Sequence, residues 1–299
     1  MRQVIGPANL PTVPSDSRPL DSRRMTGVLT FDTCPGLEPG TLLPNANDDW
    51  LQHIREVLAL LRPHGGKATF FLCEHGLSQG TEGIEAIARE GHEIGLLRCN
   101  GADRRRASED NELDAISTLR ATLQQKSGQI ITGFRDSLFP LEHSDLARWT
   151  MLANAGFQYD SSVIPYESGP DRQLSLPRYP FRVVVGSAGV TEWPLTTAKL
   201  FGNLIPLICT PSAHSLPYWF VRRAIQANNE VGWPAMIVLD VADRRELLMK
   251  LLQNCALGTL DANIRCQKPG ELTTVRLKME RAPKPVKQPC VTQQGKPEP

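Results

Sequence analysis

The chain has 299 residues, of which 40% are hydrophobic and 22% charged, a composition that is ordinary for a globular protein and excludes global disorder. Its formal net charge of +1 gives no electrostatic reason to expect binding to nucleic acid or to an anionic membrane. No apolar run approaches the roughly 20 residues of a membrane-spanning helix, and the first residues do not read as a secretory signal. The seven cysteines include no C-x-x-C pair, so we expect a cytoplasmic protein without a zinc ribbon.

The two ends of the chain differ in composition from its middle. Residues 1–24 are rich in Pro, Ser, Asp and Arg and show no hydrophobic period, which predicts a flexible arm. Residues 282–299 contain five prolines among Lys and Gln and are expected to form a disordered tail. No repeat is visible between these ends, so we expect residues 25–281 to form one domain.

Helical patterns and short apolar strands alternate through this middle segment. The first helical pattern, at 48–61, places apolar residues on one face and ends before the Gly65-Gly66 pair. Further helices are expected at 82–90, 108–127, 145–155, 217–227 and 244–257, and strands at 27–31, 68–72, 92–97, 129–131, 157–159, 182–185 and 236–241. This alternation predicts an α/β protein with a parallel sheet, either closed as a barrel or open as a doubly wound sheet. The absence of a Gly-rich loop after the first strand weakens the doubly wound alternative.

Several motifs stand where parallel barrels carry their chemistry, near the ends of the predicted strands. Residues 30–35 read T-F-D-T-C-P and resemble T-F-D-D-G-P, the first motif of polysaccharide deacetylases with a NodB homology domain. Similar matches to later motifs occur at 68–71 (A-T-F-F), 91–95 (G-H-E-I-G), 133–135 (G-F-R), 159–162 (Y-D-S-S) and 192–194 (E-W-P). The last of these is similar to a subgroup found in exopolysaccharide loci. The resemblance implies a distorted (β/α) barrel and metal-dependent N-deacetylation of a polysaccharide.

The resemblance also implies a role for individual residues. Asp32 stands at the position of the family's catalytic base, Arg135 at that of its charged partner, and Asp240 at that of the His that acts as general acid. By the same resemblance, the expected substrate-binding residues are Phe134, Asp160 and Trp193, although a Trp is as often a core residue as a surface for sugar stacking.

The family's metal ligands are replaced in this chain. One Asp and two His bind zinc or a similar cation in the family, and these positions are Thr33, Leu97 and Gly101 here. A catalytic ion usually needs three protein ligands and one open position, so we expect no metal and no other cofactor. A general base alone is worth only about 10²–10⁴-fold. The sequence therefore predicts a hydrolase-like protein of carbohydrate metabolism that is catalytically impaired, a pseudoenzyme that binds a carbohydrate or an unidentified protein partner.

Two other constellations would favour the alternative, an active hydrolase of C–N bonds in N-acetylated sugars. Cys34, Cys99 and Asp240 fall near the lost site and could form a replacement zinc site, although free cysteines usually behave as small buried residues. Arg98 could supply the positive charge that the metal once gave, or it could point outward at the rim. The presence of Asp32 and Arg135 does not decide between these readings, because a buried ion pair can persist for structural reasons.

Overall fold

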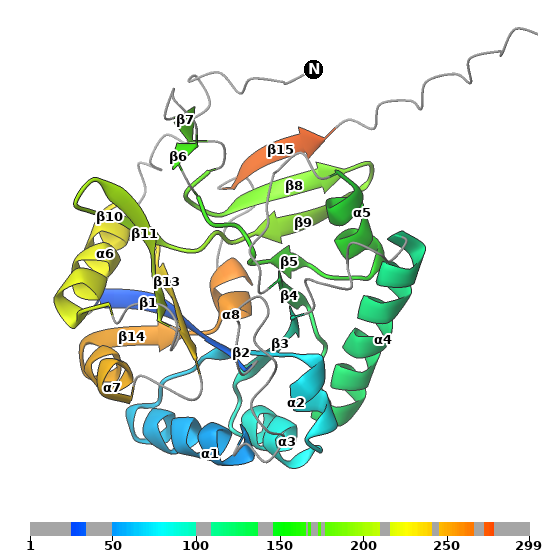
Figure 1. Cartoon of the computed structure of the whole chain (residues 1–299), viewed down its shortest axis with the longest axis horizontal. Helices are drawn as coiled ribbons and strands as arrows, with labels where there is room; N and C mark the ends of the chain where they lie inside the picture. The colour runs from blue at the N-terminus through cyan, green and yellow to red at the C-terminus, as the bar shows by residue number, and fades with distance from the viewer. Residues whose placement is uncertain are drawn as a thin grey trace, which may run out of the picture.

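The computed structural model describes residues 25–33, 50–99, 109–136, 146–165, 167–168, 173–174, 177–209, 216–240, 245–265 and 272–277. Within these residues, one sheet of eleven strands curls into a half-barrel that carries helices on its convex side (Figure 1). The distorted α/β barrel expected from the sequence is therefore confirmed. None of the helices in these ranges combines the length and the apolar character that crossing a membrane requires.

The core of the sheet is parallel, as the alternation of helices and strands predicts. Its order is β12 (Ile208–Cys209), β13 (Ala235–Asp240), β1 (Met25–Asp32), β2 (Thr69–Leu72), β3 (Glu93–Arg98), β4 (Gly133–Asp136), β5 (Tyr159–Asp160), β9 (Ala188–Glu192), β8 (Phe181–Val185) and β15 (Thr273–Leu277), with β14 (Cys255–Gly258) beside the start of β1. Only β8 and β9 pair in antiparallel fashion within this sheet. Two hairpins lie apart from it, β6 (Glu167–Ser168) with β7 (Gln173–Leu174) and β10 (Thr197–Leu200) with β11 (Asn203–Pro206).

The helices connect successive parallel strands. They are α1 (Trp50–Leu61), α2 (Glu74–Ser78), α3 (Glu82–Arg89), α4 (Glu109–Ser127), α5 (Leu146–Asn154), α6 (Tyr218–Glu230), α7 (Arg245–Asn254) and α8 (Leu260–Arg265), with a short 3-10 turn at Arg62–His64. Most of them surround the sheet, whereas α8 lies inside its curve (Figure 1). The boundaries of the six predicted helices are within two residues of the observed ones, except at the ends of α6 and α7, which differ by three residues each. The short helices α2 and α8 were not predicted.

Two predicted elements differ from the structure. Residues 129–131 are not a strand, because Gly128 ends α4 in a left-handed conformation (φ 68°) and the next residues form a connection before β4. The side chain of Gln129 holds this connection by hydrogen bonds to the backbone of His92 and Ile94. The expected helix at 244–257 ends at Asn254, and the apolar residues after it form β14 against β1. A short apolar run does not distinguish a helix end from a buried strand.

Strand alternation divides the buried side chains into two layers. Leu29 and Phe31 of β1 belong to the outer core, which is packed between the sheet and its helices. Val28 belongs to a separate inner cluster on the concave side, together with Phe71, Leu97, Tyr159, Trp193, Met236, Val238 and Leu260 of α8. The concave side is therefore filled with side chains as in other parallel barrels, and polar residues that point to it must find partners there.

Two glycines make room for aromatic side chains in this inner cluster. A Cβ atom on Gly95 of β3 would lie 2.6 Å from the Phe71 ring, and one on Gly133 of β4 would lie 2.0 Å from the Tyr159 hydroxyl. Neither approach is compatible with a side chain larger than hydrogen. Gly95 of G-H-E-I-G and Gly133 of G-F-R are thus packing requirements of the half-barrel.

Candidate active site

The parallel register brings the predicted site residues to one edge of the sheet. Asp32, the last residue of β1, is paired with Asp240 on one side and with Phe71 on the other. Leu97 is paired with Arg135, at the same ends of β3 and β4. The backbones of Asp32 and Asp240 therefore lie at the same end of the barrel, as expected of motifs that follow strand ends. The side chain of Asp240 lies outside the described part of the structure, as do all of Cys34 and Gly101.

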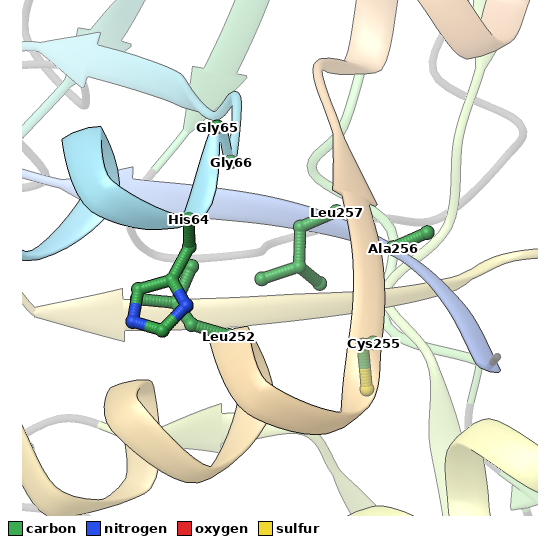
Figure 2. Close-up of a pocket in the computed structure, with 7 residues that line it drawn as sticks. All are labelled: His64, Gly65, Gly66, Leu252, Cys255, Ala256 and Leu257. Carbon is green, nitrogen blue, oxygen red and sulfur yellow. The ribbon is translucent and has the colours of Figure 1, made fainter.

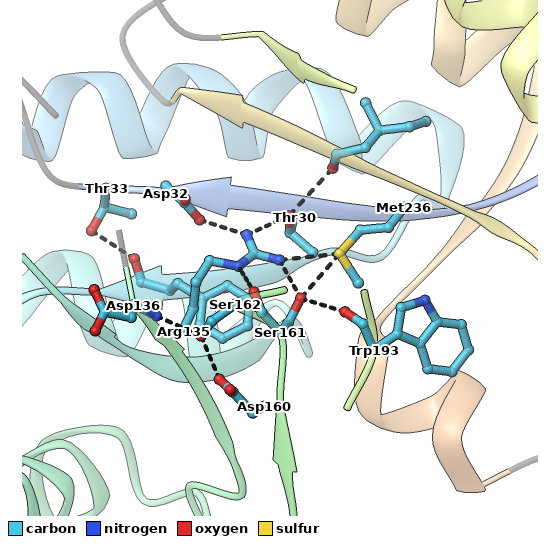
Figure 3. A network of polar contacts seen from close by, with 12 residues as sticks. Thr30, Asp32, Thr33, Arg135, Asp136, Asp160, Ser161, Ser162, Trp193 and Met236 are labelled. Atoms are coloured by element: carbon cyan, nitrogen blue, oxygen red, sulfur yellow. Dashed lines mark hydrogen bonds and ion pairs between the residues drawn. The ribbon is translucent and has the colours of Figure 1, made fainter. Parts of the chain in front are cut away.

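Arg135 is fully buried at the centre of this edge, and each of its five N–H groups has an acceptor (Figure 3). Nη1 donates to Asp32 Oδ1 at 2.7 Å and to Thr30 Oγ1 at 2.8 Å. Nε donates to Ser161 O at 3.0 Å, while Nη2 donates to Ser161 Oγ at 2.9 Å and contacts Met236 Sδ at 3.2 Å. The hydrogen bonds fix the position of the guanidinium, and all of its donors are used by groups of the chain itself.

Asp32 is equally buried, but only one of its oxygens is paired. Oδ2 has no hydrogen-bond partner, which makes it one of the few orphaned polar atoms in the described part of the structure. Burial raises the pKa of Asp32, and the charge and hydrogen bond of Arg135 act in the opposite direction. The thiol of Cys73, at the end of β2, adds a smaller upward effect on the same pKa. Asp32 and Arg135 thus form a buried ion pair in which Oδ2 of Asp32 can still accept a hydrogen bond.

Arg135 also lies over an aromatic face, since its Cζ is 4.1 Å from the centroid of the Phe71 ring. This contact adds a cation–π interaction to the ion pair. Thr30, Ser161 and Met236 were not predicted as site residues. Two-residue alternation along β1 places Thr30 on the same face as Asp32, and this signal was available in the sequence.

The positions of the family's metal ligands do not fit a divalent cation. The Thr33 hydroxyl already donates to Phe71 O at 3.1 Å. Leu97 is buried in the inner apolar cluster and has no donor atom. Among the described residues, no group of three His, Cys, Asp or Glu side chains is arranged to hold a metal. Cys99 packs against the inner cluster, as expected of a small apolar residue.

Three other predicted residues serve the packing of the barrel. Asp160 and Phe134 point to the convex side, where both contact Arg148 of α5, at 3.3 Å from Asp160 Oδ2 and 5.5 Å from the Phe134 ring centroid. Trp193 is buried in the inner cluster, edge-on to Trp233 at 6.1 Å, and its carbonyl accepts a hydrogen bond from Ser161. All of these contacts are made within the chain, and a role of the three residues in binding substrate stays a prediction.

Arg98 does not point into the site. Its guanidinium lies 3.9 Å from the carboxylate of Glu112 on α4, which covers the convex side of the sheet. The side chain is only 13% exposed, so it packs between the sheet and α4 and does not extend into solvent at the rim. The Arg98 guanidinium therefore does not supply a positive charge beside Asp32.

The comparison with known proteins begins with the family model for polysaccharide deacetylases, which matches residues 21–158, a little under half of the chain. This match supports a polysaccharide deacetylase domain. The matched segment of this domain includes Asp32, Leu97 and Arg135, whereas Trp193 and Asp240 lie beyond it. No curated protein sequence matches the chain.

Several solved structures are similar in fold to this chain. A protein from Mycobacterium smegmatis assigned as a polysaccharide deacetylase superposes with a TM-score of 0.60 at 18% identity, over 87% of this chain and 96% of that one. A 4-α-glucanotransferase from Thermococcus litoralis gives 0.56 at 12% identity, over 86% of this chain but 42% of its own. A family 4 carbohydrate esterase from Bacillus anthracis gives 0.45 at 13% identity, over 82% and 84%. At such identities the first two likenesses show the fold alone.

Proposed function

We propose that this polysaccharide deacetylase domain is catalytically impaired and binds a carbohydrate without hydrolysing it. The observation that carries the proposal is the state of the metal-ligand positions. Leu97 is an apolar member of the inner cluster, and the Thr33 hydroxyl donates its proton to a backbone carbonyl. With these two positions unable to coordinate, the expected Lewis acid has no ligand set among the residues described.

The chemistry that is left at this edge of the sheet is weak for amide hydrolysis. Asp32 Oδ1 is held by the Arg135 guanidinium at 2.7 Å, and this contact opposes the rise in the pKa of Asp32 that burial causes. A positioned base contributes about 10²–10⁴-fold, whereas enzymes in general provide accelerations of at least about 10⁶-fold. No oxyanion-stabilising donor is free on Arg135, because all five of its N–H groups are occupied.

A carbohydrate is the ligand class that the family suggests. The unpaired Oδ2 of Asp32 supports a polar ligand at this edge, since a buried carboxylate oxygen without a donor is costly. Sugar hydroxyls and amino groups both supply such donors. We infer that binding, in place of turnover, is the remaining activity of the site.

A metal-restoration experiment tests the proposal. The triple variant Thr33→Asp, Leu97→His, Gly101→His provides one carboxylate and two imidazoles, and we expect it to bind zinc in calorimetry, whereas the wild type does not. The matched control is Thr33→Asn, Leu97→Phe, Gly101→Ala, which changes the same positions without creating a ligand set. We expect little acetate release from a chito-oligosaccharide by either variant, because residue 240 is an Asp where the family has its acid His.

The alternative is an active hydrolase of C–N bonds in N-acetylated sugars, and the ion pair of Asp32 with Arg135 is the observation in its favour. Acetate release by the wild type, dependent on added zinc or cobalt and abolished by Asp32→Asn, would establish it. Loss of that activity in Cys34→Ala or Cys99→Ala would further support the replacement site. Absence of acetate release, together with measurable binding of the same oligosaccharide, supports the impaired, carbohydrate-binding protein.

A further inference from the structure

A second buried guanidinium, Arg148 of α5, lies on the convex side of the same strand ends. It donates to Asp136 Oδ2 at 3.2 Å, to Asp160 Oδ2 at 3.3 Å and to Ser162 Oγ at 3.0 Å. Ser162 Oγ in turn donates to Asp160 Oδ1 at 2.5 Å. These side chains are almost completely excluded from solvent. The ends of β4 and β5 are therefore tied to α5 by a buried network that is separate from the one around Arg135.

A third carboxyl group, Glu192 of β9, contacts this network. Glu192 is the register partner of Asp160 across the β5–β9 pair, both residues are fully buried, and their side chains interact with each other. Two carboxyl groups in contact away from water cannot both be ionised, because the like charges would repel at low dielectric. One of the two must carry a proton.

The hydrogen-bond partners decide which one it is. Asp160 receives Arg148 on one oxygen and the Ser162 hydroxyl on the other, so both of its oxygens have donors when it is ionised. Glu192 Oε1 accepts from the Val163 N–H at 3.0 Å, but Oε2 has no donor. An ionised Glu192 would leave Oε2 without a donor, whereas a proton on Oε2 would give Glu192 a hydrogen to donate to the neighbouring Asp160.

We propose that Glu192 is a neutral carboxylic acid in the folded protein, that it donates its proton to Asp160, and that this pair positions Ser161 to bind Arg135. Hydrogen bonds join the ends of β5 and β9. Trp193 N donates to Asp160 O at 2.9 Å, and Ser161 Oγ donates to Trp193 O at 3.0 Å. Ser161 then offers its carbonyl and hydroxyl oxygens to Arg135. Glu192 is thus a positioning residue that acts on the Arg135–Asp32 pair through β5.

This arrangement makes the site sensitive to pH. The charged groups around Glu192 are Asp160 of β5, Arg148 of α5 and Asp136 of β4, while the guanidinium of Arg182 on the neighbouring β8 lies over Gly189. Burial and the charge of Asp160 raise the pKa of Glu192 well above its ordinary value. Because the folded state binds this proton more tightly than the unfolded state, stability is fully present below the unfolded pKa and is lost as pH rises through the folded pKa.

Glu192→Gln is the first test, since Gln keeps the shape and presents an N–H to Asp160 without titrating. Infrared difference spectra of the wild type should contain the carbonyl band of one buried protonated acid, and this band should be missing in Glu192→Gln. The melting temperature of the wild type should fall with rising pH relative to that of the variant. Glu230→Gln, which removes an exposed carboxylate at the end of α6, is the control and should keep the wild-type band and profile.

The positioning of Arg135 is read separately, from the NMR signal of its Nε–H, which donates to Ser161 O. Exchange of this proton with solvent should accelerate by more than the ordinary hydroxide-catalysed rise as pH passes through the Glu192 transition in the wild type, whereas Glu192→Gln should show the ordinary rise alone. Identical exchange profiles in the two proteins, or a protonated-acid band that persists in Glu192→Gln, would overturn the proposal.

If Glu192→Gln does not fold, Asp160→Asn gives the same information. A neutral amide at residue 160 removes the repulsion, so the acid band should disappear at lower pH than in the wild type, and an unchanged transition would again contradict the proposal. None of these measurements uses a sugar ligand, so they stand or fall independently of the carbohydrate-binding function.

Discussion

Replacing Arg135 by Met is expected to be among the most destabilising single substitutions in this chain. Met fills part of the same volume but removes all five N–H donors and the positive charge. Asp32 is then left buried with neither of its oxygens paired to a charge, because Oδ2 has no partner even in the intact protein. The acceptors Thr30 Oγ1, Ser161 O and Ser161 Oγ lose their common donor at the same time.

The magnitude follows from these contacts. Breaking a buried ion pair by removing one partner costs about 3–5 kcal/mol, and each neutral hydrogen bond lost adds about 1 kcal/mol. The cost is not additive in full, because Met regains some apolar packing with Phe71 and Met236. We expect a loss of about 4–6 kcal/mol, which at roughly 2–4 °C per kcal/mol lowers the melting temperature by about 8–24 °C. The loss should shrink on acidification, since a protonated Asp32 is less costly to bury.

Urea unfolding of a double-mutant cycle measures this interaction. The cycle compares Arg135→Met, Asp32→Asn and the double variant, and we expect the double variant to be more stable than the sum of the single losses predicts. Arg120→Met is the matched control, because the guanidinium of Arg120 donates only to the carbonyls of Ile131 and Ala155 and has no carboxylate partner among these contacts. If Arg135→Met costs no more than Arg120→Met, or if the cycle is additive, the buried pair does not stabilise the site as argued.

Three further outcomes can be checked by thermal unfolding. Gly133→Ala should destabilise severely or prevent folding, because its Cβ would lie 2.0 Å from the Tyr159 hydroxyl, and normal stability would contradict the packing described. Phe201→Asn should stabilise by about 0.5–1 kcal/mol, because Phe201 is 94% exposed and has a left-handed φ of 49° that Asn tolerates better; a loss would contradict this. Burial lowers the pKa of His92 to about 4 in the folded state, against about 6.5 in the unfolded state. The unfolded state therefore binds a proton more readily, and the free energy of unfolding decreases as pH falls from about 6.5 to about 4. His92→Asn keeps an acceptor for the Ala68 N–H and should remove that part of the acid sensitivity; an unchanged pH profile would contradict it.

The amphipathic helices that end at glycine predicted an α/β protein with a parallel sheet, and the resemblance to the family implied that this sheet forms a distorted barrel. Gly91, Gly128 and Gly156 all adopt the left-handed conformation just after a helix, as expected of helix stops. The antiparallel β8–β9 hairpin and the strand β14 were missed, because short apolar runs carry no helical or strand period. The inner position of α8 was missed for a different reason, since its six residues form no pattern long enough to recognise.

The charged pair of the candidate site was predicted from the sequence, but the residues that hold this pair in place were not. Resemblance to the family identified Asp32 and Arg135, and the structure pairs them at 2.7 Å. The partners that hold Arg135 come from residues far away in the sequence, such as Ser161 and Met236, and no local pattern links them. Asp160 was expected to bind substrate beside Asp32, but its side chain contacts Arg148 of α5 on the other side of the sheet. Its position at a strand end was visible in the sequence, but the side of the sheet it faces depends on register.

The structure explains why this chain has the family's residues at Asp32 and Arg135 but an apolar residue at the ligand position Leu97. Asp32 and Arg135 neutralise each other, and their hydrogen bonds are almost complete within the chain, so the pair needs no metal to remain in place. A histidine at the position of Leu97 would instead be a polar ring in an apolar cluster, and without an ion it would have to find another partner or pay for its burial. Leu97 removes that cost. The presence of the charged pair is therefore evidence for the stability of the barrel edge, and evidence for hydrolysis has to come from the ligand positions.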